Sequence, residues 1–130
     1  MGEHFTFGFD YISQLLTDYY QNKYKDKEVR CECHSVKTKR QCGGWDYDEW
    51  YDALELRGSI DAVTTTTAFG KKVSIKEHSE LYSVEDTISE ILDEQLNKEG
   101  NGLCVNYVGV CSDGVYVSVT NKNKTLQLHR

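Results

Sequence analysis

Three cysteines and a histidine lie close enough in the sequence to be considered as metal ligands: Cys31, Cys33, His34 and Cys42. Structural zinc sites usually contain a Cys-x-x-Cys pair, and Cys31-Glu32-Cys33 lacks that spacing. On a strand, both sulfurs would point to one face and His34 to the other. We therefore expect Cys31 and Cys33 to be small core residues, with no metal and no other cofactor bound. The alternative is a metal-binding or thiol-dependent module built on Cys31, Cys33, His34 and Cys42.

No other pattern predicts a catalytic site. No cysteine stands at an expected helix N-terminus, where its pKa would fall. The four histidines, His4, His34, His78 and His129, lie on separate segments. Gly100-Asn101-Gly102 follows a helix and precedes a strand, the reverse of the order that a dinucleotide site requires. The carboxylates around residues 77–94 have the spacing of a solvated helix face and its approach. We expect no catalytic residues and a protein that is not an enzyme.

The segment Trp45–Asp52 has an unusual composition. Four aromatic residues and four carboxylates occupy its eight positions: Trp45, Asp46, Tyr47, Asp48, Glu49, Trp50, Tyr51 and Asp52. Aromatic residues are favoured at the centres of protein interfaces, and a rim of carboxylates would steer a basic partner. We predict that this segment binds a partner. The alternative is that Trp45, Trp50 and one tyrosine anchor the core while the acids are merely solvated.

In the first half of the chain, the spacing of apolar residues predicts one helix and two or more strands. Apolar residues at helical spacing predict a helix over residues 5–22. Alternation predicts a strand over 28–37, followed by a polar loop over 38–44. The next part is ambiguous between helix and strand, and we favour a turn or short helix over 46–51 and a strand over 53–69, where threonines are β-branched.

The second half is more regular. A turn at Gly70-Lys71 leads into a strand over Lys72–Glu77. A helix is expected over 84–98, with Ser83 as its N-cap and Gly100 beyond its end. The chain has no proline, so glycines are expected to mark the sharp turns, Gly58 among them.

A β-hairpin is expected at Asp113-Gly114, a favoured two-residue turn between β-rich segments. That turn would place Val110 opposite Val117 and Val108 opposite Val119. These valines, with Val115 and Cys104, would form one buried face of the hairpin. Residues 124–129 would add a last strand.

These elements predict one α+β domain over residues 1–130, with a mainly antiparallel sheet of about five strands and two amphipathic helices packed on one face. The length suits one core. The formal charge of −6 argues against direct nucleic-acid binding, which requires clustered Lys and Arg. No apolar stretch is long enough to span a membrane and no signal sequence is evident, so we expect a cytoplasmic protein with reduced thiols.

The function expected from these features is non-enzymatic binding. A small acidic protein with an aromatic, acidic surface could occlude a basic groove on a larger protein, such as a nuclease or another nucleic-acid-binding enzyme. Phage anti-CRISPR and other anti-defence proteins, and the immunity proteins of nuclease toxins, are of this general kind. That comparison rests on size and charge alone.

Overall fold

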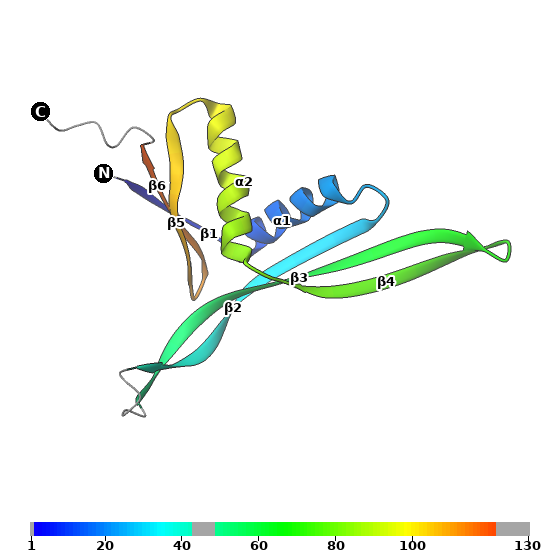
Figure 1. Ribbon diagram of the computed structural model, residues 1–130, viewed down its shortest axis with the longest axis horizontal. Helices are drawn as coiled ribbons and strands as arrows, with labels where there is room; N and C mark the ends of the chain where they lie inside the picture. Colours follow the sequence, from blue (N-terminus) through cyan, green and yellow to red (C-terminus); the bar gives the residue numbers. More distant parts are fainter. Residues whose placement is uncertain (1, 43–48, 122–130) are drawn as a thin grey trace, which may run out of the picture.

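The computed structural model describes residues 2–42 and 49–121, which form two antiparallel sheets and two helices (Figure 1). Sheet A has the strand order β1-β6-β5 and sheet B the order β2-β3-β4. The strands are β1 (Glu3–Phe7), β2 (Glu28–Cys42), β3 (Glu49–Ala68), β4 (Lys71–Leu81), β5 (Leu103–Cys111) and β6 (Gly114–Asn121), and the helices are α1 (Phe9–Lys23) and α2 (Val84–Glu99). The predicted α+β class is confirmed, although six strands form two sheets where we expected about five strands in one.

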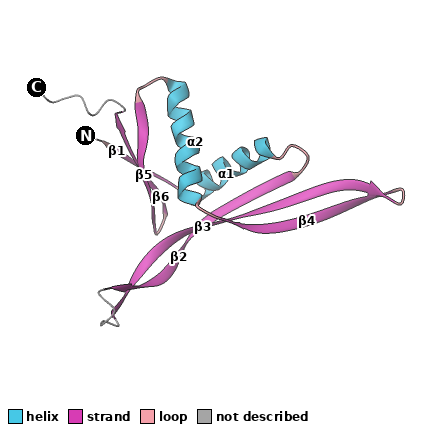
Figure 2. Cartoon of the chain, in the orientation of Figure 1, coloured by secondary structure: helices cyan, strands magenta, loops and turns pink. Residues whose placement is uncertain are grey.

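The core lies where the two helices meet both sheets (Figure 2). Helix α1 packs mainly along β2, helix α2 packs mainly along β5, and the two helices contact each other. The largest fully buried side chains come from three elements: Ile12, Leu16, Ile88, Val115 and Val117. Cys31, Cys33 and Leu56 extend this cluster into sheet B. The two sheets therefore share one hydrophobic core.

The valine face of the β5–β6 hairpin is buried as predicted, but its turn lies elsewhere. Cys111 pairs with Gly114, so Ser112 and Asp113 form the turn, and Val108 lies opposite Val117. Because side chains alternate along a strand, this two-residue shift leaves Val108, Val110, Val115, Val117 and Val119 on their expected face. The prediction is wrong for Cys104, because a bulge between Val105 and Tyr107 places Val105 opposite Val119 and Cys104 opposite Thr120. Val105 therefore takes the place of Cys104 on the valine face. A Cβ at Gly114 would collide with the carbonyl oxygen of Phe7 in β1. The glycine is needed for that close approach, and not for the turn.

The first helix is shorter than predicted. Residues 5–7 belong to β1, which pairs with β6 so that Phe5 lies opposite Val117 and Phe7 opposite Val115. The helix begins only at Phe9. The spacing of these aromatic residues fits both a helix and an alternating strand. Pairing with β6, from the far end of the chain, selects the strand. The predicted strand over 124–129 lies outside the described residues.

Sheet B is built around one long strand. Strand β3 has 20 residues, pairs with β2 along Glu49–Val63 and with β4 along Gly58–Ala68. The predicted loop over 38–44 is wrong for residues 38–42, which belong to β2, and the predicted turn or helix is wrong for residues 49–51, which belong to β3. Residues 43–48 lie outside the described part.

Gly58 is not a turn residue, contrary to our expectation. It lies inside β3, where it pairs with both Cys33 and Leu81. A Cβ there would stand 3.2 Å from Val84 Cγ2 and 3.3 Å from Leu81 Cδ1. The glycine lets the start of α2 pack closely against the middle of β3.

The second helix agrees closely with its prediction. It begins after Ser83 and ends before Gly100, whose backbone is left-handed with φ of 68°. Ser83 occupies the N-cap position but is itself left-handed, and its side chain caps no backbone N–H. Within the described residues, neither helix is long and apolar enough to cross a membrane.

Candidate functional site

Helix α1 lies along the outer edge of β2 and takes the place of a neighbouring strand. Three side chains one helical turn apart accept hydrogen bonds from alternate backbone N–H groups of β2. The donor–acceptor distances are 3.0 Å from Cys33 N to Ser13 Oγ, 2.9 Å from Cys31 N to Thr17 Oγ1, and 3.0 Å from Val29 N to Gln21 Oε1. We call Ser13, Thr17 and Gln21 the side-chain ladder.

The ladder works because the two repeats nearly match. Four residues of helix rise about 6.0 Å, and two residues of strand advance about 6.6 Å. Thr17 also donates to the carbonyl oxygen of Ser13 at 2.8 Å, which orients its hydroxyl as an acceptor for Cys31. An edge strand with unpaired backbone groups is prone to pair with other chains. The side-chain ladder provides hydrogen-bond acceptors for the backbone N–H groups on this edge, where β2 is buried.

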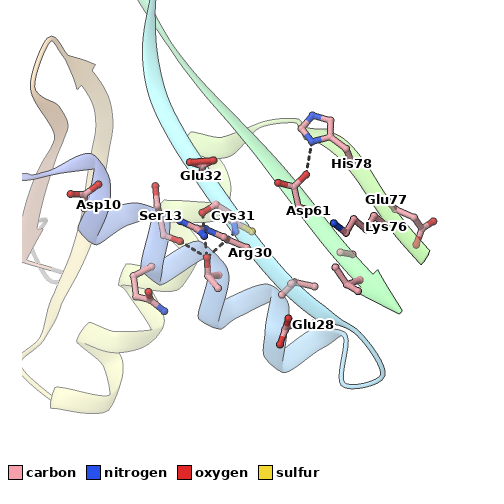
Figure 3. A pocket seen from close by; sticks show the side chains of 15 residues that line it. Asp10, Ser13, Glu28, Arg30, Cys31, Glu32, Asp61, Lys76, Glu77 and His78 are labelled. Atoms are coloured by element: carbon pink, nitrogen blue, oxygen red, sulfur yellow. Dashed lines mark hydrogen bonds and ion pairs between the residues drawn. The ribbon is translucent and has the colours of Figure 1, made fainter. Parts of the chain in front are cut away.

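Beside the ladder, an open groove of about 880 Å³ runs between α1 and the polar face of sheet B (Figure 3). Its charged lining includes Arg30 and Lys76 but is mainly acidic, with the carboxylates of Asp10, Glu28, Glu32, Asp61 and Glu77. Lys27, which does not line the groove, forms an ion pair with Glu77. The distance from Lys27 Nζ to Glu77 Oε1 is 3.2 Å. We call this feature the acidic groove.

His78 lies between two carboxylates on the polar face of sheet B. Its Nδ1 is 2.6 Å from Asp61 Oδ1, an interaction drawn in Figure 3, and its Nε2 is 3.1 Å from Glu80 Oε2. The hydrogen bonds to Asp61 and then to Glu80 raise the pKa of His78. Both ring nitrogens are engaged by carboxylates, which favours the cationic imidazole over the neutral one.

We expect His78 to titrate above the ordinary histidine pKa of about 6.5 in the folded protein. Asp61→Asn should lower that pKa most, because the hydrogen bond to Asp61 is the largest cause of the shift. Glu80→Gln should lower it less. These interactions stabilise the fold when His78 is protonated, so their contribution is present below the ordinary pKa and is lost as pH rises through the raised one. Imidazole NMR signals followed against pH measure this, and no change in Asp61→Asn would show that the pair does not form in solution.

Cys31 and Cys33 of β2 face the core, as their alternation predicted. Cys31 and Cys33 are buried, whereas His34 is exposed on the opposite face. Burial raises the pKa of the Cys31 thiol to about 11 and also raises that of Cys33. A thiol held protonated is a poor nucleophile and a poor metal ligand. Within the described residues, no three His, Cys, Asp or Glu side chains are arranged to hold a metal ion.

The described part of the segment predicted to bind a partner, Glu49–Asp52, lies at the end of the β2–β3 ribbon, away from the acidic groove. Trp45, Asp46, Tyr47 and Asp48 lie outside the described residues. Glu49, Trp50 and Tyr51 form the start of β3, opposite Cys42, Gln41 and Arg40. Asp52 is exposed, and its carboxylate lies 2.6 Å from Lys39 Nζ. The hydrogen bond from Lys39 lowers the pKa of Asp52.

The acidic groove and the side-chain ladder were not predicted as sites. Ser13, Thr17 and Gln21 have the spacing of an ordinary polar helix face, and nothing in the sequence shows that β2 lies against them. Asp61 lies on β3, and His78 and Glu80 lie on β4. The register of these two strands brings the three side chains together, because Asp61 pairs with His78. The chain matches no protein-family model, no curated protein and no solved structure.

Proposed function

We propose that this protein is a non-enzymatic binding protein that docks through sheet B onto a basic surface of a larger protein and occludes it. A nuclease or another nucleic-acid-binding enzyme is the partner class that we favour, because such enzymes carry basic grooves for phosphates. The observation that carries the proposal is the length of β3, whose 20 residues extend sheet B beyond the core on both sides (Figure 1).

Most of this extended sheet has no core of its own. The span of β3 is about 65 Å at 3.3 Å per residue. Among residues 52–68, the buried ones are Leu56 and Gly58, near the middle of the strand. In β4, every residue before Leu81 is exposed. Two- and three-stranded ribbons are only marginally stable without packing, so a partner that covers sheet B would stabilise its ends.

The charge of the acidic groove suggests what the partner looks like. The acidic groove has five carboxylates against two permanently cationic side chains, Arg30 and Lys76. At the end of the β2–β3 ribbon, Asp52 adds an exposed carboxylate, and it belongs to a segment, Trp45–Asp52, whose sequence contains four carboxylates. Carboxylates spread along an exposed surface can take the place of phosphates in a basic groove, and they speed association with a cationic partner.

A fluorescent Lys/Arg-rich peptide, used as a stand-in for the basic surface, tests this proposal. Two variants remove carboxylates: Asp10→Asn with Glu28→Gln and Glu32→Gln in the acidic groove, and Asp46→Asn with Asp48→Asn, Glu49→Gln and Asp52→Asn in the Trp45–Asp52 segment. A matched control removes three exposed or half-exposed carboxylates from α2: Glu85→Gln, Asp86→Asn and Glu90→Gln.

We expect both sheet B variants to weaken peptide binding roughly tenfold at low salt, since each exposed charge contributes about 0.2–1 kcal/mol. The loss should shrink as salt rises, because screening already weakens the attraction in the parent. All variants should keep the parent's stability to within about 0.5 kcal/mol for each substitution. Equal losses in the α2 control would show that net charge alone attracts the peptide, and would remove the docking role of sheet B.

A further inference from the structure

The β3–β4 arm, which comprises Val63–Lys76, has the opposite charge to the rest of the protein. It contains three lysines and no Asp or Glu, so its formal charge is +3. The whole chain has a formal charge of −6, which leaves −9 on the remainder. The arm projects away from the helices at one end of sheet B (Figure 1). Cations gathered on a projecting element attract an anionic partner locally, whatever the net charge.

One face of the arm is lined with hydroxyl and amino groups. Thr67 pairs with Lys72, Thr65 with Ser74 and Val63 with Lys76, so these side chains share a face. The hydroxyls of Thr65 and Ser74 are 3.4 Å apart across the two strands. Thr65, Ser74 and both lysines are exposed. This face therefore presents donors and acceptors in a regular two-stranded array.

The tip of the arm exposes an aromatic ring. Phe69 has a relative accessibility of 102%, and its backbone is left-handed with φ of 55°. A bulky residue rarely adopts that conformation, which Gly70 beside it takes without strain. Lys71 follows directly and lies on the other face of the arm from Lys72. The leading end therefore combines an apolar ring with cations on both faces.

We propose that the β3–β4 arm binds double-stranded DNA by placing its hydroxyl- and lysine-bearing face in the major groove. That groove is about 12 Å wide and admits a two-stranded β-ribbon. The hydroxyls can hydrogen-bond base edges there, the lysines can reach the phosphates that flank the groove, and Phe69 can make apolar contacts with thymine methyl groups. Six paired residues on each strand span about 20 Å, the length of roughly six base pairs.

Two other anionic partners fit the arm less well. The major groove of double-helical RNA is deep and too narrow for a ribbon. A membrane surface is flat, and contact with the face that carries Lys72 and Lys76 would leave Lys71, on the opposite face, without a partner. The proposal is separate from docking onto a basic protein, because the two ligands have opposite charge, although Val63 and Lys76 at the base of the arm also line the acidic groove.

Titration of the full chain with a 20-base-pair DNA duplex, followed by backbone amide NMR and fluorescence anisotropy, tests the proposal. We expect shift changes confined to Val63–Lys76. With three lysines on phosphates, the slope of log K against log salt should be about −2.7. Lys72→Gln with Lys76→Gln should weaken binding at least tenfold at low salt and reduce the slope to about −0.9. Phe69→Asn, which suits the left-handed backbone, should weaken binding and leave the arm folded.

The control is Lys25→Gln with Lys98→Gln, which makes the same charge change at exposed sites outside the arm. It should bind DNA as the parent does. Equal losses in this control and in the arm variant would overturn the proposal, as would shift changes outside the arm. Tighter binding to an RNA duplex, or binding to phosphatidylserine vesicles without binding to DNA, would also overturn it.

Discussion

Val117→Asp should destabilise the protein by roughly 3–5 kcal/mol, the scale for a buried charge without a partner. Val117 has a relative accessibility of 1% and lies in the central strand of sheet A. It faces the shared core between Phe5 of β1 and Val108 of β5. Among the described residues, the core neighbours of Val117 are apolar, so the new carboxylate would be buried among groups that cannot pair with it. Small domains are stable by about 5–15 kcal/mol, so much of the native state would be lost.

Denaturant unfolding of parent and variant measures this effect. Asn106→Asp is the matched control, because it places the same charge at an exposed position of the neighbouring strand β5. It should change stability by less than about 0.5 kcal/mol. If Val117→Asp unfolds at the parent's denaturant concentration, the facing of β6 described above is wrong.

Thr17→Val tests the side-chain ladder with a substitution of nearly the same shape. It removes the hydroxyl that accepts from Cys31 N at 2.9 Å, and Cys31 is buried. A buried N–H without an acceptor costs about 1–3 kcal/mol. Thr17→Ser keeps the hydroxyl and should cost less than about 1 kcal/mol.

Hydrogen exchange at Cys31 provides a second readout that does not depend on global stability. In the parent, this amide should be protected with the core. In Thr17→Val, this amide should exchange faster than the amides of α2, because its N–H no longer has a hydrogen-bond acceptor. Equal stability of the Val and Ser variants would show that the hydroxyl contributes nothing at this edge.

The sequence predicted those features that depend on local periodicity. The valine face of β5 and β6 was correct even though its turn was displaced, because a shift of two residues preserves side-chain facing. The helix ending before Gly100 was also correct, since its apolar stripe and its stop signal agree. The facing of Cys31, Cys33 and His34 followed from alternation alone.

The features that the sequence did not predict depend on partners distant in the chain. Residues 5–7 fit both a helix and a strand, and β6, more than 100 residues later, selects the strand. Glycine is typical of turns, but Gly58 lies inside β3. Val84 and Leu81 pack so close to it that a larger side chain would crowd them. The side-chain ladder requires α1 to lie against an edge of β2, which no spacing within either segment encodes. The candidate groove was missed for the same reason.

The most direct test of the docking role of sheet B is the ratio of two dissociation constants for the Lys/Arg-rich peptide at low salt. One belongs to the groove variant, Asp10→Asn with Glu28→Gln and Glu32→Gln, and the other to the α2 control, Glu85→Gln with Asp86→Asn and Glu90→Gln. Both variants change the net charge by the same amount, so the ratio isolates position from charge. Docking through sheet B predicts a dissociation constant roughly tenfold higher for the groove variant. A ratio near one would contradict it.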